Sequence, residues 1–120
     1  MKKKIAIIGS GIAGLTLANF LRMSLNSEFV VYEKEDKLNL SEGFGIQLSV
    51  NSVSILNKLG FNHLNENEIY HPKKLDFYTK EYNKICDLDL TLFNSKNEKY
   101  TTLKRSILIN FLKEKLLTNL

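Results

Sequence analysis

The fold of this chain is decided near its amino terminus, where residues 4–33 read KIAIIGSGIAGLTLANFLRMSLNSEFVVYE. The segment Lys4–Ile8 is a short apolar run that stops at a glycine, which is typical of a strand buried on both faces. From Ile12 onward, apolar residues recur at helical spacing and predict a helix that runs to about Leu25. Phe29–Glu33 is apolar and β-branched and predicts a second buried strand. Two strands joined by a crossover helix lie parallel, with a right-handed connection.

The turn between the first strand and the helix reads Gly9-Ser10-Gly11-Ile12-Ala13-Gly14, a G-x-G-x-x-G pattern. In this context the pattern indicates a Rossmann-like, dinucleotide-binding βαβ unit. Gly9 allows the tight turn, Gly11 lets a pyrophosphate approach the backbone, and Gly14 lets the helix pack close to the strand. The start of the helix offers unpaired N–H groups and a partial positive charge to the phosphates. The alternative is that the glycines only make a tight turn.

An acidic residue completes this pattern. Glu33 follows Gly14 by 19 positions and stands at the carboxyl end of the second predicted strand. Its carboxylate can accept hydrogen bonds from the hydroxyls of an adenosine ribose, and it would repel a 2′-phosphate. We therefore expect a site that binds a dinucleotide and rejects NADP. The pattern alone fits FAD and NAD equally well.

The middle of the chain predicts shorter elements. Glu35–Glu42 is polar and is expected to be a loop, and Gly43–Leu48 is expected to be extended. Asn51 or Ser52 can cap a helix that Gly60 closes. The apolar face of that helix is predicted to consist of Val53, Leu56 and Leu59.

The last third of the chain predicts a hairpin and a final helix. Two strands within Leu75–Leu92 are joined across Lys80–Lys84, and Asn94–Lys99 is a polar turn. Thr101 or Thr102 is expected to cap the helix. Its predicted apolar face consists of Ile107, Leu108, Phe111, Leu112, Lys115 and Leu116.

The composition excludes several other classes of protein. The chain has 120 residues, a net charge of +4, 43% apolar residues and a single cysteine, Cys86. These values exclude a disordered chain, a membrane bundle, an internal disulfide framework and a cysteine-based zinc site. The lysines are scattered and the arginines are few, so we expect no nucleic-acid partner.

The first residues imitate a signal peptide, because Lys2–Lys4 precede an apolar stretch. Glycines and polar residues interrupt that stretch, and no window reaches the ~18 apolar residues that a membrane span needs. We therefore expect no stable membrane anchor and a cytoplasmic location.

The remaining chemistry-bearing residues predict no further site. His63 and His71 are expected to be solvated loop histidines, and no metal site is expected. Cys86 alternates with Ile85 in a predicted strand and is expected to be a small buried residue. No catalytic set of nucleophile, base and acid is predicted. Three aromatic residues could either line a substrate face or pack within the hairpin, namely Phe77, Tyr78 and Tyr82.

Three segments, in the same order, resemble FAD-dependent monooxygenases of the p-hydroxybenzoate and salicylate hydroxylase type. The first is the glycine-rich turn, continued to Ala18 and Leu21 and followed by Val30-Val31-Tyr32-Glu33-Lys34. The second runs from Gly43-Phe44-Gly45-Ile46-Gln47-Leu48 to Leu59-Gly60. The third is Leu103-Lys104-Arg105-Ser106-Ile107-Leu108, continued to Leu112.

The resemblance implies FAD as the cofactor and assigns residues to it. The glycine-rich turn, the acid at the end of the second strand and the lysine after it would hold the adenosine and pyrophosphate. These residues are Gly9, Gly11, Ile12, Ala13, Gly14, Glu33 and Lys34. Gly45 and Ile46 would lie against the isoalloxazine ring, and Arg105 would reach the pyrophosphate or the ribityl chain. In full-length relatives, NAD(P)H reduces the flavin and O₂ then supplies an oxygen atom that hydroxylates or epoxidises a small organic substrate.

The sequence also departs from that family. Lys34 stands where the family often has arginine, and Val50 stands where it usually has proline. No third strand of the parallel sheet and no aspartate-glycine motif is found. We therefore expect residues 1–120 to be the amino-terminal part of a single FAD-binding domain, truncated before the third parallel strand. In it, residues 1–34 form the βαβ unit, and residues 35–120 add the flavin loop, the hairpin and helices.

Such a chain is expected to bind FAD weakly and not to turn over alone. The alternatives are a truncated, non-catalytic remnant, a stand-alone nucleotide-binding module, or the start of another FAD-dependent oxidoreductase. No catalytic residue is expected in this stretch.

Overall fold

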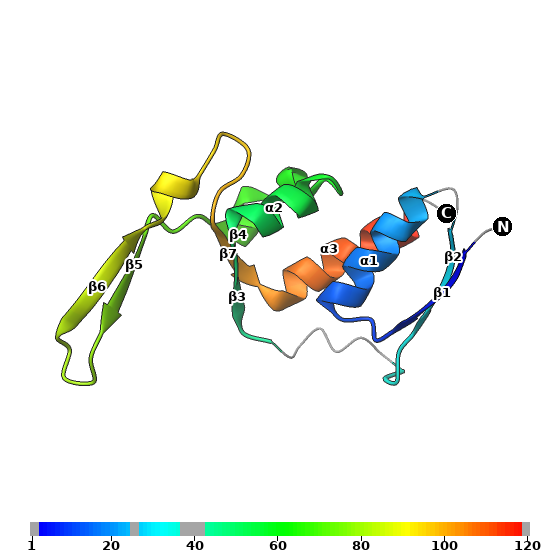
Figure 1. The fold of residues 1–120 in the computed structure, drawn as a ribbon, viewed down its shortest axis with the longest axis horizontal. Helices are drawn as coiled ribbons and strands as arrows, with labels where there is room; N and C mark the ends of the chain where they lie inside the picture. The colour runs from blue at the N-terminus through cyan, green and yellow to red at the C-terminus, as the bar shows by residue number, and fades with distance from the viewer. Residues whose placement is uncertain (1–2, 25–26, 37–42, 119–120) are drawn as a thin grey trace. The chain divides into compact units, whose positions relative to one another are not determined.

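The computed structural model describes residues 3–24, 27–36 and 43–118. The chain divides into two units, and each is described by itself. The first combines Met1–Phe44 with Lys104–Leu120, and the second is Gly45–Leu103. Figure 1 shows the elements of both units in chain order.

The first unit contains the predicted strand–helix–strand segment. Strand β1 is Lys3–Ile8, helix α1 is Ile12–Met23, and strand β2 is Ser27–Tyr32. The two strands pair in parallel along their whole length, from Lys3 opposite Ser27 to Ile8 opposite Tyr32. This confirms the Rossmann-like βαβ unit. Helix α1 ends at Met23 with Ser24 as its C-cap, two residues before the predicted end at Leu25, which lies outside the described residues.

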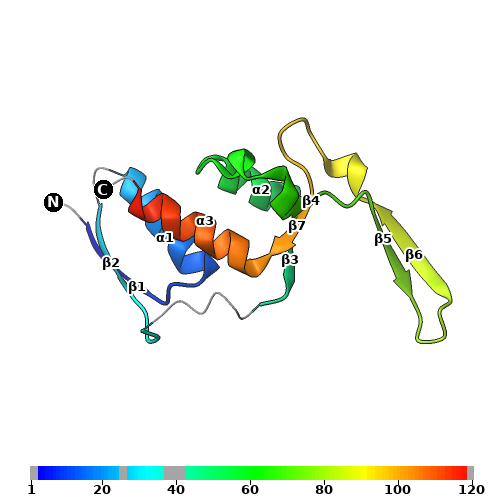
Figure 2. The same ribbon diagram turned by 180° about the vertical axis from the view of Figure 1, so that it is seen from behind.

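Helix α3, Arg105–Leu117, packs along α1, and both ribbon views show the two helices side by side (Figures 1 and 2). Their contact is apolar, because Ala18, Leu108 and Leu112 are fully buried. Two polar side chains of α1 also cross to α3. The Asn19 Nδ2 atom donates to the Leu112 carbonyl at 2.9 Å, and the Arg22 guanidinium donates to the Leu116 carbonyl.

The final helix differs from its prediction at both its start and its face. Thr101–Lys104 is strand β7, so neither Thr101 nor Thr102 is the cap, and Lys104 takes that place. Thr101 is wholly buried in a sheet, and that burial outweighs its local preference for a cap. Ile109 belongs to the buried face, which the sequence prediction omitted.

The prediction that the parallel strands are buried on both faces is wrong. Side chains alternate along β1 and β2, and one face of this pair is open, with Ile8 82% exposed, Val30 54% and Tyr32 57%. Ile7, on the opposite face, is buried. Helix α1 packs against the face with Ile7 and leaves the other face uncovered. Within the described residues, the parallel sheet has only two strands. An apolar run therefore identified the strands correctly but overstated their burial.

The second unit is built on a three-stranded sheet with the order β3-β7-β4. Strand β3 is Gly45–Leu48, β4 is Ile69–Tyr70, and β4 runs antiparallel to β7. Helix α2, Val50–Asn57, starts after the N-cap Ser49 and not after Asn51 or Ser52. Short 3-10 turns follow at Phe61–His63 (η1), Glu66–Glu68 (η2) and Leu90–Phe93 (η3). The core of this unit consists of Val53, Leu56, Leu59, Phe61, Leu90 and Leu103.

Helix α2 ends at Asn57 with Lys58 as its C-cap, so the prediction that Gly60 closes this helix is wrong. Gly60 instead precedes η1, with a φ of 91° in the left-handed region that favours glycine. The predicted helix face is confirmed for Val53 and Leu56, which are buried. Leu59 is buried as well, but it lies beyond the end of the helix.

The predicted hairpin is present, with β5 at Lys74–Tyr78 and β6 at Lys84–Asp89. Its second strand ends earlier than predicted, because η3 begins at Leu90. One face of the hairpin is charged, and there the Lys84 ammonium lies 2.9 Å from Asp76 and 2.7 Å from Asp87.

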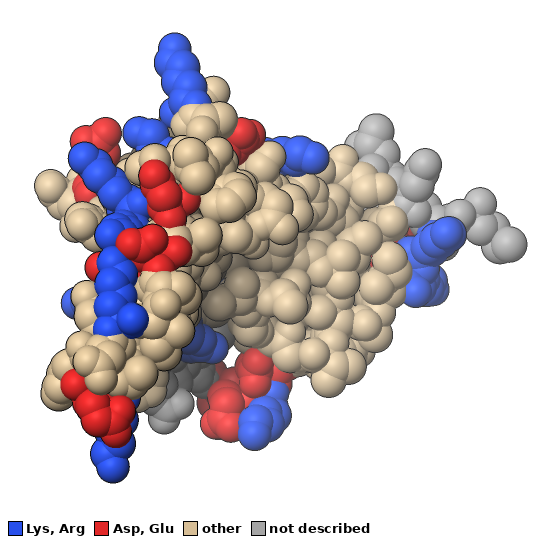
Figure 3. Space-filling model, turned by 60° about the vertical axis from the view of Figure 1, so that its left-hand side comes forward, with Lys and Arg blue, Asp and Glu red and all other residues tan. Residues whose placement is uncertain are grey.

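On the side of the molecule shown in Figure 3, basic and acidic side chains are interspersed and do not gather by sign.

The other face of the hairpin carries apolar side chains, because Leu75 pairs with Leu88 and Phe77 with Cys86. Cys86 is exposed, so the prediction of a buried cysteine is wrong. Phe77 is also about half exposed. The reason is that β5 and β6 contact mainly each other, with η3 against β5, and the described residues place no second layer on this ribbon.

Candidate dinucleotide-binding site

The glycine-rich turn needs glycine at two of its three positions for steric reasons. Gly9 has a φ of 98°, which disfavours any side chain, and its N–H donates to the Tyr32 carbonyl at 2.7 Å. A Cβ atom on Gly14 would lie 2.0 Å from the Gly9 carbonyl oxygen, so helix and turn approach too closely for any other residue. These contacts join the turn to the end of β2 and to the first turn of α1.

Gly11 has no such steric requirement within the chain itself. A Cβ atom there would meet nothing within 4 Å, and the residue has an ordinary extended conformation as the N-cap of α1. The space beside it is therefore open, which fits the predicted approach of a pyrophosphate. Ile12 is half-buried and Ala13 exposed in the first helical turn, and no acidic residue there opposes an anion.

Glu33 follows β2 directly and contacts the glycine-rich turn through Ser10. The Ser10 N–H and the Ser10 hydroxyl both donate to Glu33 Oε2, at 2.7 and 2.8 Å. The other oxygen, Oε1, accepts from the N–H groups of Lys34 and Glu35, at 2.9 and 3.2 Å. The hydrogen bond from the Ser10 backbone, followed by the one from its side chain, lowers the pKa of Glu33 to about 2.

Ser10 is the site residue that sequence reasoning missed. The glycine pattern treats its position as variable, and Ser10 and Glu33 are 23 residues apart. A hydroxyl within the pattern, followed by an acid at the end of the next strand, was the available signal. Lys34 contacts Glu33 through its backbone, while its side chain is exposed and lies 3.6 Å from Glu35.

Arg105, the first residue of α3, packs against Gly43. A Cβ atom on Gly43 would lie 3.0 Å from both Cβ and Cδ of Arg105, and Gly43 has a φ of 138°. The Arg105 N–H donates to the Phe44 carbonyl at 3.2 Å. Gly43 and Phe44 therefore lie against the first residue of α3, with Gly43 beside the aliphatic part of the Arg105 side chain.

Gly45 and Ile46 lie at the start of β3, in the second unit. Gly45 is exposed and Ile46 is half-buried. Val50 is the first residue of α2, a position that proline favours because its missing N–H would be unpaired there in any case. This gives a physical reason for the proline that the resembled family has at this point.

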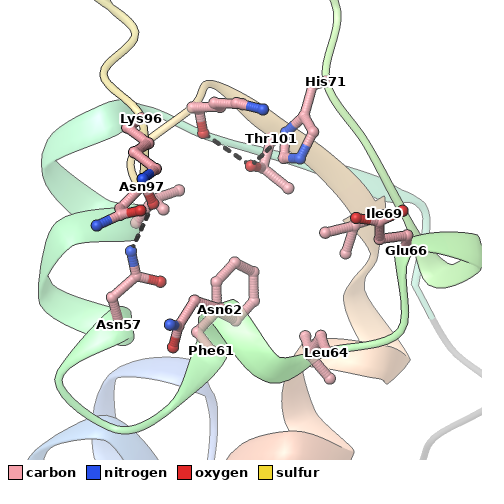
Figure 4. Close-up of a pocket in the computed structure, with 12 residues that line it drawn as sticks. Asn57, Phe61, Asn62, Leu64, Glu66, Ile69, His71, Lys96, Asn97 and Thr101 are labelled. Atoms are coloured by element: carbon pink, nitrogen blue, oxygen red, sulfur yellow. Dashed lines mark hydrogen bonds between the residues drawn. The ribbon is translucent and has the colours of Figure 1, made fainter.

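The second unit also contains a pocket of about 240 Å³ between α2, η1, β4 and β7 (Figure 4). The Asn57 side chain donates to the Asn97 carbonyl at 2.8 Å, and its buried Oδ1 has no hydrogen-bond partner among the described residues. Phe61 forms part of the apolar lining.

His71 lines this pocket, so the expectation that it is only a solvated loop residue is wrong. Its Nδ1 lies 3.2 Å from the Tyr100 carbonyl and 3.1 Å from the Thr101 hydroxyl. The Thr101 hydroxyl already donates to the Lys99 carbonyl, and the Tyr100 carbonyl can only accept. His71 Nδ1 is therefore assigned as the protonated donor to both. His63 is exposed, as predicted. No cluster of metal-ligating side chains is found in the described parts of the chain.

Known proteins similar to this chain include both a family of dinucleotide-binding domains and flavin-dependent enzymes. Residues 7–41 match the family described as NAD(P)-binding Rossmann-like domain. The chain is 43% identical over 58 residues to the FAD-dependent monooxygenase anuJ of Penicillium roqueforti, a match that covers 48% of this chain and 7% of that protein. It is 44% identical over 57 residues to the 3-amino-4-hydroxybenzoate 2-monooxygenase of Streptomyces cremeus, covering 48% of this chain and 14% of that protein. Over about half of its length, the chain is therefore similar in sequence to FAD-dependent monooxygenases.

Solved structures show the same fold over nearly the whole length of this chain. The tetrameric form of 2-methyl-3-hydroxypyridine-5-carboxylic acid oxygenase superimposes with a TM-score of 0.75 at 20% identity, covering 96% of this chain and 29% of the other. The p-nitrophenol 4-monooxygenase PnpA of Pseudomonas putida DLL-E4 gives 0.76 at 17% identity, covering 97% and 30%.

The chain therefore matches only a part of much longer proteins. It spans less than a third of the solved structures and a fifth or less of the curated relatives it matches. None of its described helices is long and apolar enough to cross a membrane.

Proposed function

We propose that this chain binds FAD through the first unit, as the cofactor-binding part of a flavoprotein monooxygenase. The observation that carries the proposal is the Glu33 carboxylate, held at the end of β2 by Ser10 of the glycine-rich turn. A carboxylate in that place accepts hydrogen bonds from the ribose hydroxyls of an adenosine. The open space beside Gly11 admits the pyrophosphate.

The chain's own residues fit an anionic dinucleotide. The start of α1 supplies N–H groups and a partial positive charge, and its first turn has no acid. Arg105 adds a planar, permanently charged group suited to phosphate oxygens. A cation at a helix start opposes the helix dipole, which favours a ligand-related reason for it. Gly45 and Ile46 lie in the second unit, so their predicted place against the flavin ring stays a prediction.

When bound, FAD would supply the redox chemistry that links NAD(P)H and O₂ to a small organic substrate. The described residues contribute binding and orientation, and we propose no catalytic side chain among them. Accordingly, the chain alone is expected to bind FAD without turnover. HpxO of Klebsiella pneumoniae, solved as a complex with FAD and uric acid, has the same fold over 92% of this chain with a TM-score of 0.67.

The test is a titration of the purified chain with FAD, NAD and NADP, followed by flavin fluorescence and by thermal unfolding. At a hundredfold excess over its dissociation constant, a ligand adds about 2.7 kcal/mol of stability. We expect saturable binding of FAD that Glu33→Arg abolishes. The matched control is Glu81→Arg, the same charge change on an exposed residue of the hairpin loop, which should leave binding intact.

A folded chain that ignores FAD would contradict the proposal. The second candidate function is an NAD-binding module, which the family matched by residues 7–41 favours. Saturable binding of NAD in preference to FAD, with the same loss in Glu33→Arg, would support it instead.

A further inference from the structure

Ser10 stands between the first two glycines of the turn, and both of its donors point at one oxygen of Glu33. The N–H lies 2.7 Å and the hydroxyl 2.8 Å from Oε2. Ser10 is 6% exposed, so its hydroxyl is nearly removed from water and depends on this partner.

The carboxylate is held at its other oxygen too. Oε1 accepts from the backbone N–H groups of Lys34 and Glu35. A glutamate side chain with this many donors is fixed in one orientation, although residue Glu33 as a whole is exposed and its outer side can be reached from solvent. Of the four donors only the Ser10 hydroxyl belongs to a side chain, and so only that one can be removed by substitution without changing the backbone.

We propose that Ser10 is a positioning residue for the ribose-binding carboxylate. It ties the phosphate-binding turn to Glu33, so that the acid is oriented and ionised before the cofactor arrives. This inference rests on the proposed function, since it assigns Ser10 a role at the same site. A group ordered in advance loses less conformational freedom on binding, and this raises affinity for the ligand.

The charge state supports the same role. Hydrogen bonds from Ser10 lower the pKa of Glu33 to about 2, whereas an unperturbed glutamate would be close to 4.5. The acid thus stays a pure acceptor at mildly acidic pH. Loss of the hydroxyl raises this pKa, because a donor to the charged form is removed.

The experiment compares the wild type with Ser10→Ala and Ser10→Thr. The pKa of Glu33 is measured by carboxyl-carbon NMR of glutamate-labelled protein, and the resonance is assigned by its absence in Glu33→Gln. The dissociation constant for FAD is measured at pH 7 and pH 4. The matched control is Ser54→Ala, a half-buried serine of α2 in the second unit.

We expect Ser10→Ala to raise the Glu33 pKa and to weaken FAD binding about five- to tenfold at pH 7. The ratio of the Ser10→Ala to the wild-type dissociation constant should not fall between pH 7 and pH 4, because the variant's carboxyl takes up its proton at a higher pH than that of the wild type. Ser10→Thr keeps the hydroxyl and should restore both quantities, and the control should change neither. A general packing defect would not move the Glu33 pKa.

The proposal is overturned if the Glu33 pKa is the same in Ser10→Ala and the wild type, or if FAD affinity is unchanged or improved. If Ser10→Ala does not fold, the Ser10→Thr pKa and affinity decide, since a retained hydroxyl must leave both at the wild-type values. Failure of the proposed function would give a different result from failure of this inference. The wild type would then not bind FAD at all, while the NMR titration would still report whether Ser10 changes the pKa of Glu33.

Discussion

The Asn19 side chain donates to the carbonyl of Leu112, 93 residues further along the chain, at 2.9 Å. The same Nδ2 donates to the Leu15 carbonyl one helical turn back, at 2.8 Å. Asn19 is 3% exposed, so this amide is a buried polar link between α1 and α3 with both its donors satisfied.

Asn19→Ala should therefore destabilise the first unit by about 1–3 kcal/mol, because it leaves a cavity and removes the polar partner of the Leu112 carbonyl. Urea unfolding measures the change in the free energy of unfolding. Asn110→Ala, on the exposed side of α3, is the control and should change stability little. Equal stabilities of the Asn19 variant and the wild type would contradict the link.

The two glycines Gly14 and Gly11 should respond differently to alanine. Gly14→Ala places a Cβ atom 2.0 Å from the Gly9 carbonyl and must displace backbone, at a cost of about 3 kcal/mol or more. Gly11→Ala meets open space and should change the free energy of unfolding by only about 1 kcal/mol or less.

Gly11→Ala should nevertheless lose FAD affinity, because its methyl group would stand where the pyrophosphate approaches. Thermal unfolding and FAD titration of the two variants separate these effects. If Gly11→Ala bound FAD with wild-type affinity, the pyrophosphate would not lie beside Gly11.

Glu33 should make stability depend on pH in the acidic range. Its pKa in the folded chain is lowered from 4.5 to about 2, so folding favours the ionised form. The stabilisation is therefore fully present above pH 4.5 and is lost as the pH falls towards 2. The difference in unfolding free energy between wild type and Glu33→Gln should shrink across this window. Glu81→Gln should show no such trend, and a constant difference for Glu33→Gln would disprove the linkage.

Cys86 should react readily with a thiol reagent in the folded chain, because its side chain lies on the exposed face of β6. The expected reaction is one equivalent per chain, at a rate close to that of the urea-unfolded chain. Cys86→Ser supplies the blank. Protection that disappears only on unfolding would mean that another part of the protein covers the apolar face of the hairpin.

Much of the first unit could be predicted from the sequence because its signals are local. The order of strand, glycine turn, helix and strand follows from residues only a few positions apart, as does the place of Glu33 at the end of β2. The steric demand at Gly14 is also local, since the atom it would strike belongs to Gly9.

Other predictions failed where distant segments decide. Thr101 has the chemistry of a helix cap, yet it is buried within β7, which pairs with β3 and β4. Cys86 sits in an alternating strand pattern, yet the ribbon has no layer over it among the described residues. The local sequence pattern shows that a side chain can be buried. Actual burial requires another helix or strand to pack against it, and the local pattern does not contain that element.

The βαβ unit, the glycine-rich turn and the acid after the second strand could thus be predicted from local sequence, because each depends on backbone sterics and short-range periodicity. Three contacts became visible only in the folded chain: Ser10 holds Glu33, α3 packs on α1, and Gly43 lies against Arg105. These contacts join residues 23 or more positions apart, and such pairs are selected by how whole elements pack together.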